Sequence, residues 1–375
     1  MKNKILFLHT IANTPYKHFY YNLLAERFDV HVIQLAHYSR IHEWESLENK
    51  IYSENIIHHG FLDSRKKINS LLKIRKLIKA INPEIIISHG YDRLEFLFSP
   101  FLFRDKILIC EVATTYIDKK RYFIKEKIKS VVLNNLFDYF FTYGISSKNY
   151  LVEKLGISEN KVFIRGNFSH LQMENHLVSS ISSRRNQILY VGRFSEEKNV
   201  KTLISAFIDF STNDQNKYNL ILVGSGPLKD KLINYVNSFG YISNIEFIDY
   251  KNVDELIPYY QNSKLFVLPS YSEPWGQVVN EAMHFGLPII ISQNCGSVED
   301  LCKENSIKFD PYKKNELTAI FSELLNNENK LERMSNASLE IIKNFVPKKL
   351  IQTQLALFYS ILKLRFQEKI PSTPN

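Results

Sequence analysis

The sequence predicts an α/β protein with two doubly wound domains and a cleft between them, on three observations. The chain has 375 residues, which allows a sizeable core in each of two domains. Short apolar runs alternate with helical patterns, as in parallel sheets that carry helices on both faces. A polar, serine-rich stretch at residues 169–186 breaks this alternation and predicts a linker. The expected division is an N-terminal domain at 1–170, a linker at 171–186, a C-terminal domain at 187–346 and a last segment at 347–375.

The N-terminal half shows the alternation from its first residues. Strand-like runs occupy residues 4–10, 29–36, 85–90, 106–112, 139–144 and 161–167. Helical patterns lie between them at residues 16–28, 68–81 and 146–156. Ligands of such sheets bind off the carboxyl ends of the strands, so the turns after these runs are expected to face the cleft.

A second α/β series follows the linker. Its strand-like runs are residues 187–195, 218–226, 244–250, 264–270, 287–292 and 306–310. Residues 348–366, after Pro347, have the pattern of one long amphipathic helix. The chain shows no internal repeat that would favour a different architecture.

The charge balance is basic. Lys and Arg number 48 against 39 Asp and Glu, a formal net charge of +9, and the pI is about 9.1. This surplus favours anionic partners, namely nucleotide phosphates, nucleic acid or an acidic membrane face. Nucleic acid is not expected as a partner, because no helix-turn-helix, zinc-finger or RNP pattern occurs.

Other sequence features argue against several classes of protein. Three cysteines without CxxC spacing suggest neither a disulfide framework nor a zinc site. The N-terminal apolar run, Ile5–Leu8, is too short for a signal peptide. No segment approaches the roughly 18 consecutive apolar residues of a membrane span. We therefore expect a cytoplasmic protein.

The segment at residues 272–291 carries two carboxylates between two strand-like runs. Pro274 suits the first position of a helix, and Gly286 suits the C′ position just after its end. The pattern predicts a helix from Pro274 to Phe285 with Glu273 as its N-cap.

The start of this helix predicts a site for an anion. Its first N–H groups, near Gly276 and Gln277, would lie at the positive end of the helix dipole, where phosphate binds. Glu273 and Glu281 would be about 12 Å apart along the axis, so one could bind the sugar and the other the ribose of a sugar nucleotide. The spacing alone favours a plainer interpretation, a simple N-cap and a solvated helix residue.

Two further turns support the sugar-nucleotide interpretation. Arg193 and Lys198 follow one strand-like run and precede a helix, where two cations could neutralise a diphosphate. Gly224 and Gly226 form a glycine-rich turn after the next run, but the third glycine of GxGxxG is missing and Lys229 stands near its position. The dinucleotide-binding signal is therefore weak.

Together these motifs resemble the C-terminal domain of family 4 retaining glycosyltransferases, which have the two-domain GT-B fold. The similarity covers residues 187–345 and is carried, in order, by "GRFSEEKN", "LVGSGPL", "FVLPSYSEPWGQVVNEAMHFGLPII" and "CGSVEDL". It implies two Rossmann-like domains, of which the first binds the acceptor and the second the nucleotide sugar. It also implies that the last helix packs back onto the N-terminal domain.

The resemblance assigns roles to individual residues. It implies catalytic roles for Glu273, Arg193, Lys198 and His89, and donor binding by Glu281, Gly276, Trp275, Gln277, Gly192, Gly224, Gly226 and Pro274. Glu111, Asn13 and Tyr250 are further candidates for the cleft, Tyr250 near the base. For His89 a structural role stays as open as a catalytic one. Family members often carry a glycine pair after the first strand, whereas residues 9–18 contain no glycine, so this loop approaches the donor differently or serves the acceptor.

The implied function is metal-independent, retaining transfer of a sugar from a nucleoside diphosphate sugar to a glycan or lipid-linked acceptor. Surface polysaccharide synthesis (O-antigen of lipopolysaccharide, capsule or exopolysaccharide) is the expected setting, and no cofactor is expected. No Asp-x-Asp motif occurs that would hold a metal. Two alternatives stay open: a non-catalytic partner subunit, which should have lost one of the four charged site residues, and a GT-B nucleotide-sugar epimerase.

An anionic membrane surface is a further candidate partner. Residues 117–133 place six Lys and Arg among aromatic and aliphatic side chains, and residues 94–104 are rich in aromatics and leucine. Basic amphipathic stretches bind anionic lipid, which would make the protein peripheral on the inner face of the cell membrane. A solvated helix face beside a buried helix is the equally open alternative.

Overall fold

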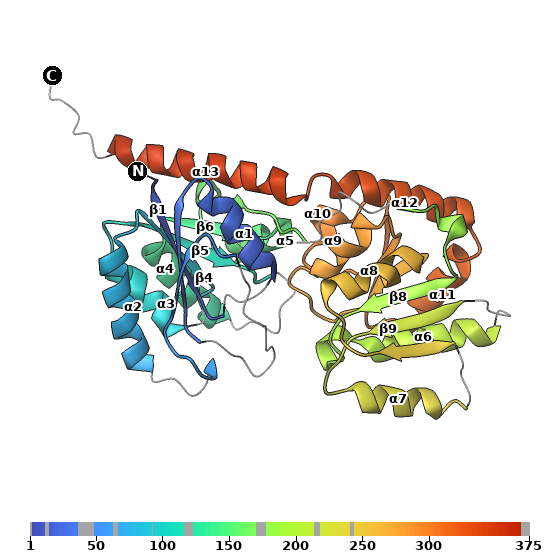
Figure 1. Cartoon of the computed structure of the whole chain (residues 1–375). Helices are drawn as coiled ribbons and strands as arrows, with labels where there is room; N and C mark the ends of the chain where they lie inside the picture. Colours follow the sequence, from blue (N-terminus) through green and yellow to red (C-terminus); the bar gives the residue numbers. More distant parts are fainter. Residues whose placement is uncertain are drawn as a thin grey trace, which may run out of the picture.

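The structure, a computed structural model, describes residues 2–11, 15–36, 49–62, 67–91, 93–115, 123–169, 178–213, 218–240 and 244–368. These residues form two parallel sheets, each with helices on both faces, side by side in the molecule (Figure 1). The predicted α/β class, with two Rossmann-like units, is confirmed.

The N-terminal sheet has the strand order β3-β2-β1-β4-β5-β6-β7 in the described residues. Its strands are β1 (Lys4–His9), β2 (Asp29–Gln34), β3 (Ser53–Ile56), β4 (Ile85–His89), β5 (Ile107–Val112), β6 (Tyr139–Thr142) and β7 (Val162–Ile164). The central strands are buried on both faces, as their unbroken apolar runs predict. Strand β3 was not predicted, because it is a polar edge strand without an apolar run.

Two helical layers cover this sheet. The helices of this half are α1 (Pro15–Ala25), α2 (Lys67–Ile81), α3 (Leu94–Phe101), α4 (Phe123–Leu136) and α5 (Ile145–Asn149). Buried side chains of α2, α3 and α4 form one core with one sheet face. Buried side chains of α1 form the other core with the opposite face, together with the C-terminal helix α13 (Pro347–Glu368).

The C-terminal sheet has the order β10-β9-β8-β11-β12-β13. Its strands are β8 (Gln187–Val191), β9 (Asn219–Val223), β10 (Ile245–Ile248), β11 (Leu265–Leu268), β12 (Ile289–Ser292) and β13 (Ser306–Phe309). The helices around it are α6 (Val200–Asn213), α7 (Lys229–Asn237), α8 (Val253–Asn262), α9 (Gln277–His284), α10 (Val298–Leu301), α11 (Lys314–Leu324) and α12 (Glu328–Ile342). One continuous core joins them.

The order of strands in each sheet locates the expected sites. Chain order reverses between β1 and β4 in the first sheet and between β8 and β11 in the second. Open α/β sheets bind ligands at such switch points, off the carboxyl ends of the strands. The loops after β1, β4, β8 and β11 are therefore the places to look for function.

Helix α13 returns the chain from the C-terminal half to the N-terminal half (Figure 1). It follows α12 of the C-terminal half and runs along the N-terminal sheet (Figure 1). Phe358, fully buried, packs its ring against Phe28 and Phe141, and the Gln354 side chain donates to the carbonyl of Arg165 at 2.9 Å.

No helix in the described part of the chain combines the length and the apolar character that crossing a bilayer requires.

Candidate active site

The helix after β11 begins later than the sequence pattern predicts. Helix α9 starts at Gln277, and Gly276 before it has φ 81°, ψ 68°. This left-handed backbone cannot continue a helix, so the assignment of Pro274 to the first helical position and of Glu273 to the N-cap is wrong. The predicted end is confirmed, since Gly286 follows α9 with φ 65°.

Glu273 lies instead in an extended loop at the carboxyl edge of the sheet. It pairs with Cys295 as in a short parallel ladder, and its carbonyl accepts a hydrogen bond from the Gly296 N–H at 2.8 Å. The loop after β12 thus fixes the backbone of Glu273. Its side chain, mostly buried, forms an ion pair with Lys198.

Lys198 reaches Glu273 from the other side of the switch point. It ends a short helical turn, Glu196–Lys198, in the loop after β8. Arg193 is exposed earlier in the same loop, and among the described residues its guanidinium has no ion-pair partner. Two loops far apart in sequence therefore bring the Lys198 ammonium to the Glu273 carboxylate before α9, and Arg193 lies in the loop that carries Lys198.

Glycines bring two of these loops into backbone contact. A Cβ at Gly224 would lie 1.9 Å from the carbonyl oxygen of Gly192, and one at Gly226 would lie 2.5 Å from that of Phe194. The Phe194 N–H donates to the carbonyl of Ser225 at 2.8 Å. These glycines allow the β9 loop to support the loop that carries Arg193 and Lys198; their expected contact with donor stays a prediction.

Glu281 is buried inside the domain, contrary to its interpretation as a solvated helix residue. It is 6% exposed and accepts a hydrogen bond from the Tyr260 hydroxyl at 2.8 Å. Burial raises the pKa of Glu281 to about 7, although bonds from Tyr260 and Ser169 oppose this rise. A half-ionised buried carboxyl of this kind is suited to accept hydroxyl hydrogen bonds such as those of a ribose diol.

Tyr250 lies on the same side of the domain. It is 59% exposed in the loop after β10. Partial desolvation raises the pKa of its hydroxyl, with smaller contributions from the charges of Glu255 and Glu281. An exposed aromatic ring within electrostatic range of Glu281 fits the expected neighbourhood of the base.

Trp275 and Gln277 contact the N-terminal half. Trp275 is buried, donates to the Asn280 side chain at 2.8 Å and packs its ring so closely on Gly144 that a Cβ there would lie 2.5 Å away. The Gln277 side chain donates to the carbonyl of Phe168 at 2.8 Å. Both side chains join the two halves, and donor binding by them stays a prediction.

On the N-terminal side, His89 and Glu111 form a hydrogen-bonded pair. His89 Nδ1 and Glu111 Oε2 are 2.8 Å apart, and Glu111 Oε1 pairs with Arg165 at 2.5 Å. Burial would raise the pKa of Glu111, but Arg165, His89 and Lys17 together lower it to about 2. Glu111 is thus ionised with both oxygens occupied, which makes it an orienting group for His89 and not a nucleophile.

Three residues that the sequence analysis missed complete this group. His9 lies 4.4 Å from His89 between ring centroids, and Lys17 Nζ is 3.3 Å from His9 Nδ1. Arg165 follows β7. We call His9, Lys17, His89, Glu111 and Arg165 the N-terminal cluster. His9 and Arg165 are polar residues at the carboxyl ends of apolar runs, a signal that could have revealed them; Lys17, in the first turn of α1, has no such signal.

The N-terminal cluster contains ligand atoms of the types that bind metals, but its buried cations would repel a metal ion. Ligand atoms of His9, His89 and Glu111 lie within 4.8 Å of one another. Arg165 already pairs with Glu111, however, and Lys17 contacts His9. A metal cation there would be repelled by two buried cations, so the residues do not fit a metal.

The loop after β5, which follows Glu111, lies next to the loop after β12 of the other half. Thr115, in the loop after β5, is so close to Gly296 that a Cβ there would lie 2.6 Å from its methyl group. Gly296 in turn donates to the carbonyl of Glu273. Asn13, the remaining candidate, lies outside the described residues.

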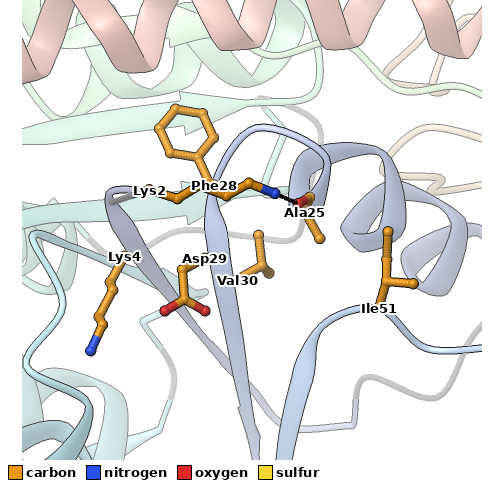
Figure 2. A pocket seen from close by; sticks show the side chains of 7 residues that line it. All are labelled: Lys2, Lys4, Ala25, Phe28, Asp29, Val30 and Ile51. Carbon is orange, nitrogen blue, oxygen red and sulfur yellow. Dashed lines mark hydrogen bonds between the residues drawn. The ribbon is translucent and has the colours of Figure 1, made fainter.

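A surface hollow of about 350 Å³ lies at the opposite edge of the N-terminal sheet. Its lining comes from the amino ends of β1 and β2, the end of α1 and Ile51 (Figure 2). Lys2 there donates to the carbonyl of Ala25 at 2.7 Å. The hollow is remote from the carboxyl edge and adds nothing to the site.

Comparison with known families gives an independent result. Residues 172–340 match the model of the family described as glycosyl transferases group 1. This segment is a glycosyltransferase group 1 domain. The group 1 domain includes Arg193, Lys198, Glu273 and Glu281, while the N-terminal cluster lies outside it.

Curated relatives match over parts of their length. An uncharacterized glycosyltransferase of Haemophilus influenzae is 31% identical over 137 residues, 36% of this chain and 38% of that protein. The α-monoglucosyldiacylglycerol synthase of Acholeplasma laidlawii is 35% identical over 100 residues, 26% of this chain and 24% of the synthase. The O-antigen chain mannosyltransferase B of Escherichia coli is 29% identical over 133 residues, 34% of this chain and 33% of the enzyme. The matches thus span well under half of the length of these relatives.

Solved structures match over nearly the whole chain. HepE of Anabaena, solved with UDP, gives a TM-score of 0.76 at 16% identity, over 95% of this chain and 100% of that one. The sucrose-phosphate synthase of Thermosynechococcus elongatus gives 0.76 at 16%, over 96% and 100%. The lipopolysaccharide outer core galactosyltransferase WaaB gives 0.73 at 15%, over 95% and 99%. At these identities the likeness establishes the fold, which is GT-B as expected.

Proposed function

We propose that the protein is a family 4, retaining glycosyltransferase. It moves a sugar from a nucleoside diphosphate sugar to a glycan or lipid-linked acceptor in surface polysaccharide synthesis. The observation that carries this proposal is the ion pair of Lys198 and Glu273, which two distant loops form at the switch point of the group 1 domain.

Each residue of this site has a role in the proposal. Lys198 and Arg193 stabilise the negative charge that develops on the departing diphosphate. The first N–H groups of α9 have no intrahelical acceptor and add the positive end of the helix dipole. Glu273 accepts hydrogen bonds from the sugar hydroxyls, and Glu281 accepts them from the ribose diol.

The reaction breaks the bond between the anomeric carbon and the diphosphate oxygen and forms the new glycosidic bond on the same face. The acceptor hydroxyl gives its proton to the departing phosphate oxygen, so no carboxylate nucleophile is needed. His89, whose pKa burial lowers, is neutral. Because its Nδ1 donates to Glu111, its Nε2 can accept a hydrogen bond from a substrate hydroxyl.

Metal independence is part of the proposal and follows from the charges. Enzymes that use a cation for a departing diphosphate need carboxylates to hold it. Here the carboxylate at the site, Glu273, pairs with Lys198, and Arg193 supplies a second positive charge. Chelator treatment of the purified protein is expected to leave its turnover unchanged.

The proposal includes a cytoplasmic location. The surface of the N-terminal half supports an anionic membrane as an additional partner. Helices α2, α3 and α4 form one layer. Its exposed apolar side chains are Ile68, Leu72, Leu94, Ile128, Val131 and Val132, and its exposed cations on α2 and α4 include Lys67, Lys73, Arg75, Lys76, Lys79, Lys125 and Lys127. We propose that this layer binds anionic lipid. Part of the predicted basic segment, residues 116–122, lies outside the described residues.

The test begins with the donor. Thermal-shift screening against UDP-, GDP- and ADP-sugars identifies the nucleotide, and transfer to a glycan or lipid-linked acceptor is then followed by mass spectrometry, with the anomeric configuration read by NMR. The expected product retains the configuration of the donor. An inverted product would contradict the retaining mechanism, and binding of none of the donors would contradict the function.

Two controls separate the alternatives. Isomerisation of the donor without any acceptor would identify an epimerase instead. Lys198→Ala is expected to lower transfer by on the order of 10²- to 10³-fold, whereas the matched control Lys343→Ala, at an exposed lysine after α12, should leave it unchanged. A wild-type protein that binds donor yet transfers nothing to a broad acceptor panel would support the non-catalytic partner.

A further inference from the structure

The N-terminal cluster contains more buried positive charge than its own residues compensate. Lys17 and Arg165 are cations, 8% and 6% exposed, and Glu111 is the carboxylate among them. Burial lowers the pKa of both His9 and His89, so these rings are neutral. Two cations and one carboxylate leave a surplus of one positive charge in the free protein.

The surplus charge belongs to Lys17. Arg165 pairs directly with Glu111 and its guanidinium lies 4.9 Å from the rings of Tyr20 and Tyr143. The Lys17 ammonium instead contacts uncharged atoms, His9 Nδ1 at 3.3 Å and the Ile11 carbonyl at 3.1 Å. An ammonium has three N–H donors. His9 and Ile11 accept from two of them, and within the described part of the chain the third has no acceptor.

The desolvation of Lys17 fits this arrangement. Burial lowers its pKa to about 8, and the positive charge of Arg165 contributes, while Glu111 opposes the change. A buried cation without a paired anion is costly in a folded protein. Binding of an anion next to Lys17 would remove that cost.

The position of Lys17 makes a substrate the natural source of the anion. It stands in the first turn of α1, next to β1 at the switch point of the N-terminal sheet. The segment between β1 and α1, residues 10–14, contains no glycine, so a close backbone approach to phosphate is not favoured there. A lysine side chain provides the same electrostatic contact as a point charge.

We propose that Lys17, held by His9, binds a phosphate group of a substrate at the carboxyl edge of the N-terminal sheet. The phosphate comes either from the diphosphate of the donor or from a phosphorylated acceptor, and the contact is the same, an N–H of the ammonium to a phosphate oxygen. The inference rests on the proposed function for the identity of the substrates, but the binding site itself can be tested without turnover.

The variants are chosen to separate charge from packing. Lys17→Met keeps the length of the side chain and removes its charge, and Lys17→Arg keeps the charge. Lys154→Met, at an exposed position at the end of the helical turn Tyr150–Lys154, is the control for loss of one positive charge in the same domain. Circular dichroism and melting temperature establish that each variant is folded.

Two probes distinguish the sources of the phosphate. UDP, GDP and ADP are titrated calorimetrically into each protein, and inorganic phosphate is titrated into protein saturated with the nucleotide that binds. Lys17→Met is expected to lower the affinity for one probe at least tenfold, whereas Lys17→Arg and Lys154→Met should bind both probes with near wild-type affinity. Loss of nucleotide affinity assigns the phosphate to the donor, and loss of inorganic phosphate affinity assigns it to the acceptor. Wild-type affinity of Lys17→Met for all probes would overturn the proposal, as would a wild-type protein that binds none of them.

A pH profile adds a readout that a purely structural lysine would not change. Wild-type affinity for the assigned probe should fall as pH rises through about 8, because the ammonium loses its proton, whereas Lys17→Arg should stay flat to pH 9.5. The other groups facing Lys17 are His9, His89, Glu111, Arg165 and the ring of Tyr16. His9, His89, Glu111 and Arg165 keep one charge state over this range. A flat wild-type profile from pH 7 to 9.5 would contradict the proposal.

Failure of this inference and failure of the proposed function give different results. If Lys198→Ala loses nucleotide binding while Lys17→Met keeps wild-type affinity for both probes, the transferase proposal stands and the inference falls. If phosphate binding depends on Lys17 but no nucleotide sugar binds or reacts, the inference stands and the transferase proposal falls.

Discussion

The two switch points of this molecule use charge in opposite ways. In the group 1 domain, Lys198 and Glu273 form a pair at the carboxyl edge of the sheet, with their side chains 21% and 11% exposed, and we call it the rim pair. Arg193 is exposed in the loop that carries Lys198. In the N-terminal cluster, Glu111 and Arg165 are both buried and locked together. The first arrangement can exchange partners when an anionic substrate arrives, whereas the second can only hold its neighbours in place. Under the proposed function, we therefore expect Lys198 and Glu273 to contact the donor, and Glu111 and Arg165 to hold the neighbouring side chains of the N-terminal cluster in position.

The largest effect is expected when the buried pair is broken. Arg165→Ala leaves the Glu111 carboxylate buried without its strongest partner, which should reduce the free energy of unfolding by about 3–5 kcal/mol. Urea denaturation followed by circular dichroism measures this. The double variant Arg165→Met/Glu111→Gln removes both charges and should recover part of the loss. A loss below about 1 kcal/mol for Arg165→Ala would show that the two switch points do not differ in this way.

Breaking the rim pair should affect turnover and not stability. Lys198→Ala or Glu273→Ala is expected to lower turnover by on the order of 10²- to 10³-fold, because a group aimed at the transition state is lost. The melting temperature of either variant should stay within a few degrees of wild type. Near-normal turnover in either purified variant would remove the basis for the proposed donor site.

The two buried glutamates should respond to pH in opposite directions. The pKa of Glu111 is about 2, below its ordinary value of 4.5, so its stabilising effect is present above pH 4.5 and is lost as pH falls toward 2. The pKa of Glu281 is about 7, so its contribution is present below pH 4.5 and is lost as pH rises toward 7.

Unfolding of Glu111→Gln and Glu281→Gln from pH 2 to 8 measures both effects. The stability difference from wild type should change by on the order of 3 kcal/mol over each window. Relative to wild type, Glu281→Gln should become more stable as pH rises, and Glu111→Gln should become less stable. Parallel profiles for the two variants would contradict the contrast between the sites.

The smallest effect concerns the exposed face of α2. Lys73→Glu/Lys76→Glu should weaken flotation with anionic vesicles by about 1 kcal/mol or more for each position, since each cation near a charged bilayer contributes about that amount. Vesicles of zwitterionic lipid and the variant Lys313→Glu/Lys343→Glu, on the other half of the molecule, are the controls. Absence of wild-type flotation on anionic vesicles would remove the membrane from the proposal.

The same contrast explains what could be predicted from the sequence. The donor site lies in contiguous motifs, so Lys198 and Glu273 could be assigned to one site before the structure brought them together. The N-terminal cluster draws His9, His89 and Arg165 from three separate strand ends, and no local pattern links them. Among structural details, the edge strand β3 lacks an apolar run, and the late start of α9 depends on a left-handed Gly276 that proline-based rules do not detect.

The C-terminal helix α13 has a consequence for the order in which the molecule is completed. Phe358 and its neighbours cover Phe28 and Phe141 on a face of the sheet that is synthesised first. During translation α1 can cover its own part of that face, but the part under α13 stays uncovered until the ribosome has made the whole group 1 domain and the helix beyond it. The N-terminal half is therefore synthesised first but completes its folding last. Nascent chains that lack α13 would expose aromatic side chains to chaperones and proteases.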